Sequence, residues 1–181
     1  MTTILKRAVL PLLLLFVFLF ENMFSTVVPT ELFWKGSIAA PHFLIIVLCF
    51  ITVYYSPLQG IYYGLLFGFL FDTVYTELVG VYIFAYPILA YLVYSAMRVL
   101  QLNLFIVSFI VLTGIAALEY YVYGFLTLLG RIHVPAHIFF TDRLLATLLL
   151  NGIFLLIVCF PLRRYLVRLS KAMEEKEKRI F

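Results

Sequence analysis

The stretch GIYYGLLFGFLFD, residues 60–72, decides how the rest of the sequence is interpreted. Gly60, Gly64, Gly68 and Asp72 recur there at intervals of four residues. A step of four residues turns an α-helix by about 400°, so these residues form one slowly drifting stripe. Glycines spaced in this way let a neighbouring membrane helix approach closely, because no side chain stands between the two backbones. We therefore expect the stripe to pack against another helix, with dimerisation as the alternative.

Apolar residues dominate the chain on both sides of this stretch. Of 181 residues, 65% are hydrophobic and 12% are charged, and the mean hydropathy is +1.12. Ordinary soluble domains carry about 25% charged residues. A membrane-spanning helix needs about 20 mainly apolar residues, so six of them nearly exhaust the chain. The sequence predicts an all-α integral membrane protein, a bundle of six transmembrane helices at about 8–28, 38–55, 58–76, 81–97, 104–126 and 144–162.

Positive charges are unevenly divided between the two ends of these predicted helices. Cytoplasmic segments of membrane proteins carry an excess of Lys and Arg. This rule predicts that both termini are cytoplasmic and that the 130–142 connector is outside. It also predicts a transmembrane domain over residues 1–162, followed by a charged cytoplasmic helix or tail over residues 163–181. Ten cations share the side of the termini and three lie opposite: Lys6, Arg7, Arg98, Arg163, Arg164, Arg168, Lys171, Lys176, Lys178 and Arg179 against Lys35, Arg131 and Arg143.

Three acidic residues interrupt the apolar segments, namely Glu21, Asp72 and Glu119. A charged side chain at the centre of a membrane helix costs about 2.5–3.5 kcal/mol on insertion scales, so such residues usually have a partner or line a cavity. The helical rise of about 1.5 Å per residue places all three at a similar depth, in the outer third of the membrane. One hypothesis is an outer polar cluster around a shared cavity, joined by His42 and Arg143. The alternative is that each acid separately caps a helix end or reaches the headgroups.

The start of the C-terminal segment has an amphipathic pattern. Such a pattern suits a helix that lies on the headgroups of the inner leaflet or that docks a cytoplasmic partner. A charged anchor that only fixes the topology is the alternative. The apolar stripe consists of Leu162, Leu166, Leu169 and Met173, and the candidate contact residues on the other faces are Arg163, Arg164, Arg168 and Lys171.

No pattern in the sequence points to catalysis. The chain has no phosphate-binding loop, nucleophile elbow, HExxH sequence or nucleotide-binding fingerprint. Cys49 and Cys159 lie singly in apolar runs, which favours small core residues over a disulfide or a metal site. We therefore expect neither a cofactor nor a metal, and no enzymatic activity.

A longer stretch, GIYYGLLFGFLFDTVYTELVGVYIFAYPILAYLV at residues 60–93, carries a resemblance to a known family. Its glycine ladder, Asp72, Gly80 and the apolar helix that follows resemble the MreD family of bacterial rod shape-determining membrane proteins. The resemblance implies a scaffold of the cell-elongation machinery in the bacterial cytoplasmic membrane. The implied partners are the bitopic protein MreC, the elongation polymerase and transpeptidase, the filament protein MreB directly or through another protein, and membrane lipid, without nucleic acid.

The same family is similar in fold to the substrate-binding membrane subunits of energy-coupling-factor transporters. Those subunits bind their ligand from the outer side of the membrane. The resemblance therefore leaves a second function open, that of a solute-binding subunit of a transporter. An outer cavity could hold either part of a partner protein or a small molecule.

Overall fold

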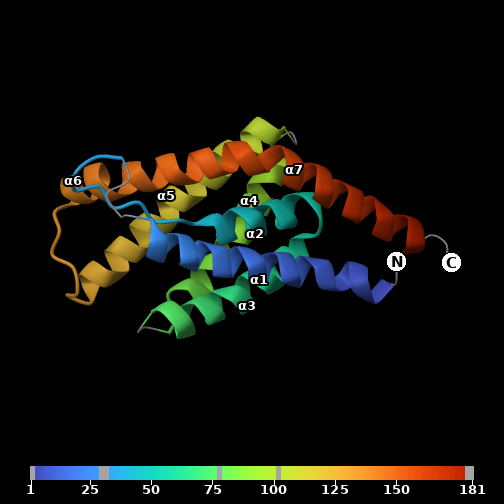
Figure 1. Cartoon of the computed structure of the whole chain (residues 1–181), viewed down its shortest axis with the longest axis horizontal. Coiled ribbons are helices and arrows are strands. Elements are labelled where there is room, and N and C mark those ends of the chain that lie inside the picture. The colour runs from blue at the N-terminus through green and yellow to red at the C-terminus, as the bar shows by residue number, and fades with distance from the viewer. Residues whose placement is uncertain (1–2, 29–32, 77–78, 101–102, 178–181) are drawn as a thin grey trace. The chain divides into compact units, whose positions relative to one another are not determined.

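The computed structural model describes residues 3–28, 33–76, 79–100 and 103–177, with the side chains of residues 3–8 and 174–177 outside the described part. The expected basic side chains of Lys6, Arg7, Lys176, Lys178 and Arg179 are therefore not described. All regular elements in the described part are helical (Figure 1). They are α1 (Thr3–Val27), α2 (Phe43–Tyr54), α3 (Pro57–Tyr75), α4 (Tyr82–Val99), α5 (Leu104–Leu128), α6 (Ala136–Ile138), the π-helical segment η1 (Phe139–Leu144) and α7 (Leu145–Glu177).

Among the described residues, four helical stretches are candidate membrane spans. These stretches are Val9–Val27, Tyr82–Val99, Leu104–Leu128 and Ala136–Met173, each long and apolar enough to span a bilayer. The apolar α2 has only 12 residues. The prediction of an all-α, multi-pass membrane protein is confirmed, and the number of six membrane-spanning helices stays a prediction.

Helix boundaries agree with the sequence for α3, α4 and α5. The first helix begins at Thr3, five residues before the predicted start, and the predicted helices at 38–55 and 144–162 differ as well. The predicted helix over 38–55 begins only at Phe43, because Pro41 disfavours helical geometry at the residue before it. The last helix begins at Ala136, inside the predicted connector, directly after Pro135. It then continues through η1 and past Pro161 to Glu177, so no break separates residues 162 and 163.

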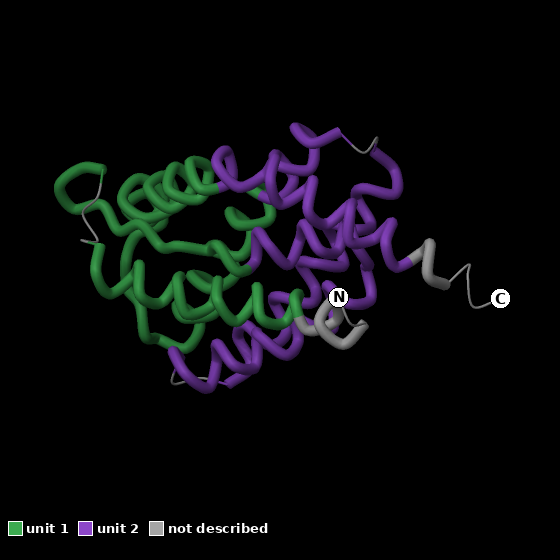
Figure 2. Tube along the Cα trace, turned by 45° about the vertical axis from the view of Figure 1, so that its right-hand side comes forward, with its two compact units in different colours: residues 1–44, 112–154 green, residues 45–111, 155–181 purple. Residues whose placement is uncertain are grey.

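The chain divides into two compact units (Figure 2). Unit 1 comprises residues 1–44 and 112–154, and unit 2 comprises residues 45–111 and 155–181. In unit 1 an aromatic cluster surrounds the start of α2: the Phe43 ring stacks on Phe154 with centroids 4.0 Å apart and meets Phe24 edge-on at 5.3 Å. Large aromatic rings bury much apolar surface, so this cluster fixes the N-terminal end of α2 in the core.

Unit 2 is built on α2 and on the antiparallel pair α3 and α4. Every residue from Ile45 to Ile51 is at most 2% exposed. A helix that is apolar all round is expected to be buried on all sides, and α2 meets that expectation. Both cysteines are also buried and unpaired, as the sequence favours.

The glycine stripe of α3 lies against other segments of unit 2. A methyl group on Gly60 would overlap the Thr52 side chain, and one on Gly68 would overlap the Tyr82 carbonyl group. One on Gly64 would lie 3.2 Å from the backbone of Pro87, which is tighter than ordinary van der Waals contact. The stripe therefore brings α3 close to α2 and α4 of its own chain, a geometry that favours packing over dimerisation.

The close approach at Gly68 yields a stability prediction. Gly68→Ala should lower the free energy of unfolding by about 1–3 kcal/mol, because the new methyl group has to displace backbone atoms at the start of α4. The matched control is Gly152→Ala in α7, where an added methyl group meets nothing within 4 Å. The control should gain up to about 1 kcal/mol from the better helix propensity of alanine. Thermal unfolding of both variants in one detergent would contradict close packing at α3 if they proved equally stable.

Candidate functional site

An extended segment of unit 1, residues 38–42, is held by polar side chains at the start of α7. Ala40 donates its N–H to Thr147 Oγ1 at 3.1 Å, and its carbonyl group accepts from Asn151 Nδ2 at 2.9 Å. His42 donates its N–H to Asn151 Oδ1 at 2.7 Å. Both Thr147 and Asn151 are fully buried. These side chains replace the hydrogen bonds that a helix would supply, and irregular backbone away from water requires such partners.

Glu119, on α5, forms the centre of a buried ionic group next to this segment. His42 Nε2 lies 2.7 Å from Glu119 Oε1, and Arg143 Nε donates to Glu119 Oε2 at 2.7 Å. Glu119 and His42 are 2% and 3% exposed, whereas the Arg143 side chain is about one-third exposed, at 35%. A buried carboxylate is tolerated when it is paired and hydrogen-bonded, and here one buried ring and one cation provide both.

Arg143 reaches Glu119 from the π-helical segment η1. The cap residues on both sides of η1 keep helical dihedral angles, so the segment is one widened turn inside a continuous helix. A π-helical turn shifts the side chains that follow it around the helix axis and is frequent at functional sites. Its position is what brings a cation of the last helix to the acid of α5.

Glu21, on α1, binds the first turn of α2. Its Oε2 atom accepts the N–H of Leu44 at 2.7 Å, and the side chain is 3% exposed. The N–H groups of a first helical turn have no partner within the helix, and a carboxylate there also favours the positive end of the helix dipole. Glu21 thus acts as a cap supplied by a neighbouring helix.

Asp72, on α3, performs the same task for α4 in unit 2. The N-cap residue of α4 is Val81, whose side chain cannot accept a hydrogen bond. Asp72 Oδ1 accepts the N–H of Tyr82 at 2.9 Å, and Oδ2 accepts those of Gly80 at 2.8 Å and Ile83 at 3.0 Å. Asp72 is completely buried, so its carboxylate is committed to these amides.

The three acids of the proposed outer polar cluster have their described contacts in different units. Glu21 and Glu119 both belong to unit 1: Glu21 binds Leu44 in the first turn of α2, and Glu119 binds His42 directly before that helix. The partners described for Asp72 all belong to unit 2. The contacts of Glu21 and Asp72 fit helix capping, while Glu119 joins His42 and Arg143. Sequence reasoning missed Thr147 and Asn151, although an Asn in an apolar helix was a visible signal.

A cavity of about 310 Å³ in unit 1 reaches the Glu119–Arg143 pair. Its walls are mostly aliphatic and aromatic, with few polar groups, as in sites that bind apolar groups in a fixed orientation. Tyr123 donates its hydroxyl group to the Val134 carbonyl group at 2.7 Å and stacks on Phe139, so this wall is internally braced. The lining residues include three charged residues, Glu119, Asp142 and Arg143, and otherwise mainly Ile38, Tyr123, Leu126, Ile132, Val134, Ile138 and Phe139.

The amphipathic segment at the end of α7 has one buried face and one exposed face. The leucines of its apolar stripe, Leu162, Leu166 and Leu169, are buried inside the protein, and contact of this segment with the inner leaflet or with a partner stays a prediction. The candidate contact residues on the opposite faces, Arg163, Arg164, Arg168 and Lys171, are all exposed.

Within the described residues no group of His, Cys, Asp and Glu side chains could hold a metal ion.

The ionic group predicts strong coupling between two side chains. Glu119→Ala and Arg143→Ala should each destabilise the protein, and the double variant should cost about 1–3 kcal/mol less than their sum, because each single change strands a partner. Free energies of unfolding in detergent measure this cycle. A control cycle pairs Glu119→Ala with Lys35→Ala, an exposed cation of unit 1 outside this group, and should be additive. Additivity in the Arg143 cycle as well would contradict the ion pair.

Comparison with known proteins gives the family. The model of the family described as rod shape-determining protein MreD matches residues 6–169. The rod shape-determining protein MreD of Bacillus subtilis is 34% identical over 171 residues, which cover 94% of this chain and 99% of that relative. No solved structure matches the chain, so the likeness to transporter subunits stays a prediction. The resemblance seen in residues 60–93 is confirmed, and the chain belongs to the MreD family of non-enzymatic, rod shape-determining membrane proteins.

Proposed function

We propose that this protein is a membrane scaffold of the bacterial cell-elongation machinery, which maintains rod shape by coupling cytoskeletal filaments to peptidoglycan synthesis. The match to rod shape-determining proteins over nearly the whole chain carries this proposal. Its partners would be an MreC-like bitopic membrane protein and the elongation polymerase and transpeptidase. An MreB-like filament would be contacted directly or through another protein.

The buried acids have structural contacts, which supports a mechanism based on binding partners. Asp72 and Glu21 cap helices, and Glu119 is held by His42 and Arg143. Acids that fix the backbone in this way keep surfaces in a constant shape. A scaffold needs such constancy, because preformed surfaces lose less conformational entropy on binding.

We propose a six-span arrangement in the cytoplasmic membrane with both termini inside the cell. The ten-to-three division of Lys and Arg supports this orientation. A 12-residue helix is about 18 Å long, shorter than the roughly 30 Å hydrocarbon core, so in this arrangement the extended segment 38–42 crosses the remainder. The side chains of Thr147 and Asn151 satisfy that segment's backbone, as the membrane interior requires. The charged segment 163–181 would then lie on the cytoplasmic side.

In this orientation the cavity at Glu119 and Arg143 opens toward the outer side. We propose that it receives an apolar segment of the bitopic partner, since its walls are mainly aliphatic and aromatic. The volume of the cavity is also compatible with the second candidate function, a solute-binding subunit of a transporter, because pockets for small molecules begin at about 300 Å³.

Filling the cavity tests this proposal. Ile138 lines the cavity and is 39% exposed, so Ile138→Trp should block it without disturbing the core. In cells depleted of the native protein, this variant should accumulate normally, copurify with the bitopic partner at least tenfold less, and fail to restore rod shape. The matched control is Leu128→Trp at the end of α5, a position 89% exposed and outside the cavity lining, which should behave as wild type.

The same pair of variants separates the two candidate functions. Mass spectrometry of the purified wild-type protein would favour a solute-binding subunit if it found a tightly retained small molecule that Ile138→Trp excludes. Normal cell shape and an intact complex with the filled cavity would contradict docking at this site. Normal cell shape after depletion of the protein itself would contradict the scaffold function as a whole.

A further inference from the structure

The part of α7 that lies in unit 2 has one face turned into the protein and one turned outward. Leu162, Leu166 and Leu169 are at most 9% exposed, so they hold the helix in place. The outward face carries Arg163, Arg164, Arg168 and Lys171. The sequence between residues 160 and 173 contains no acid to neutralise them. A rigid helix therefore presents several positive charges at fixed positions.

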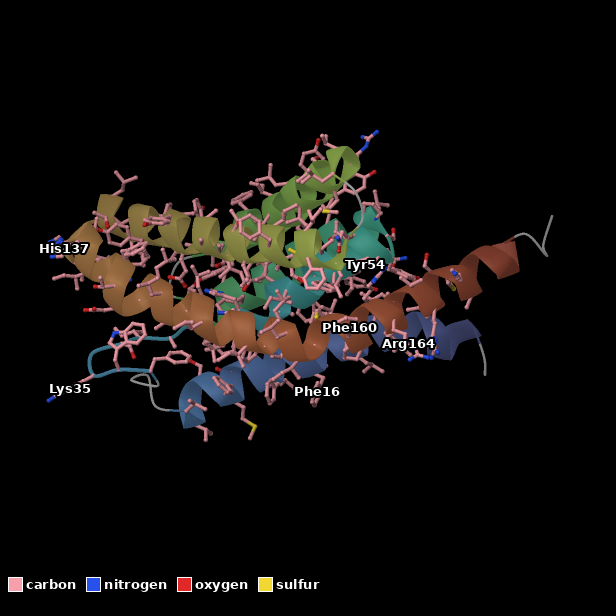
Figure 3. The ribbon with its side chains drawn as sticks, turned by 90° about the horizontal axis from the view of Figure 1, so that it is seen from above. Phe16, Lys35, Tyr54, His137, Phe160 and Arg164 are labelled. Carbon is pink, nitrogen blue, oxygen red and sulfur yellow. The ribbon has the colours of Figure 1, made fainter. Side chains whose placement is uncertain are left out.

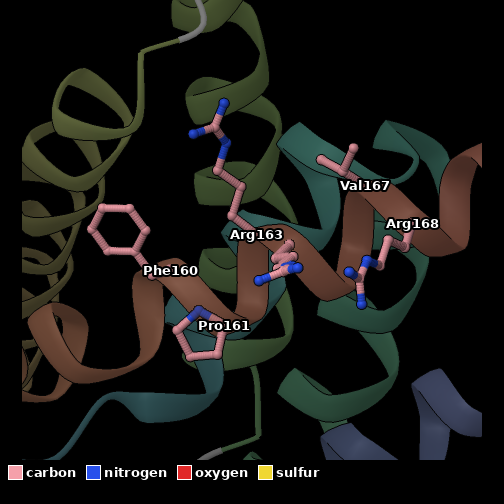
Figure 4. A pocket seen from close by; sticks show the side chains of 6 residues that line it. Phe160, Pro161, Arg163, Val167 and Arg168 are labelled. Atoms are coloured by element: carbon pink, nitrogen blue, oxygen red, sulfur yellow. The ribbon is translucent and has the colours of Figure 1, made fainter.

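A hollow of about 600 Å³ lies among these arginines. Figure 4 shows Phe160 and Pro161 toward one end of the hollow and Arg168 toward the other. The Arg163 guanidinium lies 5.6 Å from the centre of the Tyr54 ring, a cation–π arrangement that fixes this wall. Arg164 and Arg168 are four residues apart and share one side of the helix, about 6 Å apart along the axis. Two planar guanidinium groups at this spacing can both donate to one phosphate group.

The arginines continue an exposed apolar strip of the same helix. Ile157 is 70% exposed and Phe160 is 65% exposed. Positions 157, 160, 164 and 168 follow one side of the helix, with Phe160 and Arg164 on successive turns (Figure 3). The strip from Ile157 to Arg168 is about 16 Å long, of which one half is apolar and the other half cationic.

We propose that this strip, formed by Ile157, Phe160, Arg164 and Arg168, is a binding site for an anionic phospholipid. The phosphate group lies between the Arg164 and Arg168 guanidinium groups, and an acyl chain lies along Phe160 and Ile157. Both halves of the strip match an amphiphile with a negative head, whereas an acidic soluble segment would leave the apolar half unused. This site is independent of the cavity in unit 1 and of the coupling proposed above.

Native mass spectrometry of the full-length protein in detergent, titrated with phosphatidylglycerol and with phosphatidylcholine, tests the site. The wild-type protein should retain phosphatidylglycerol in preference to phosphatidylcholine. Arg164→Gln combined with Arg168→Gln should reduce phosphatidylglycerol binding by about tenfold or more, because each cation near an anionic headgroup strengthens binding severalfold. Arg164→Lys combined with Arg168→Lys should restore most of the preference. Phe160→Ser should weaken the retention of both lipids.

The matched control is Arg98→Gln, since Arg98 is exposed and also lies over a tyrosine ring, that of Tyr94 at 5.9 Å, without neighbouring cations on its helix. The control should retain phosphatidylglycerol as wild type does, and thermal unfolding should confirm that each variant is folded. Unchanged retention in the Gln double variant would overturn the proposal. Displacement of the lipid by millimolar inorganic phosphate would also overturn it, by assigning the arginines to a free anion. If the Gln double variant lost a bound acidic protein while it retained the lipid as wild type does, the face would be assigned to a protein partner and the proposal would be overturned.

Discussion

Buried carboxylates that accept hydrogen bonds from backbone amides are the interaction on which the rest of the structure depends. The first amides of a helix have no partner within it, and in an apolar environment water cannot serve. Asp72 supplies that partner for α4, and Glu21 supplies it for α2. In each case the acid comes from a different helix, so one contact both caps a helix and fixes its position against a neighbour. The cost of placing an acid in an apolar segment is offset by the backbone groups that it satisfies.

The same requirement shapes the extended segment before α2. Residues 38–42 are not helical, and Thr147 and Asn151 on α7 supply hydrogen bonds to the backbone of Ala40 and His42. His42 extends this network to Glu119, which in turn holds Arg143. The cavity lies where this network meets the braced aromatic wall of Tyr123 and Phe139. A fixed polar network beside an apolar hollow is suited to recognising one shape, which fits a family of non-enzymatic, rod shape-determining membrane proteins.

Much of the helical framework could be predicted from the sequence, because hydropathy and the glycine interval directly report membrane helices and close packing. The start of α2 could not be, since Ile38 and Ala39 are as apolar as a helix interior and only Pro41 indicates the change. The burial of Leu162 and Leu166 was also hidden, because an apolar stripe looks the same whether it faces lipid or protein. Asp72 caps α4 because the side chain of Val81, the N-cap residue, cannot accept a hydrogen bond. This relation between two helices becomes visible only in the structure.

The capping role of Asp72 is tested most directly by hydrogen–deuterium exchange at the amides of Tyr82 and Ile83. These amides should exchange slowly in the wild-type protein and about tenfold faster or more in Asp72→Ala, because removal of the carboxylate leaves them without an acceptor. The Phe105 amide, which donates to Asn103 at the start of α5, serves as an internal reference and should not change. Equal exchange rates at Tyr82 and Ile83 in both proteins would contradict the claim that a buried carboxylate holds α4 in place.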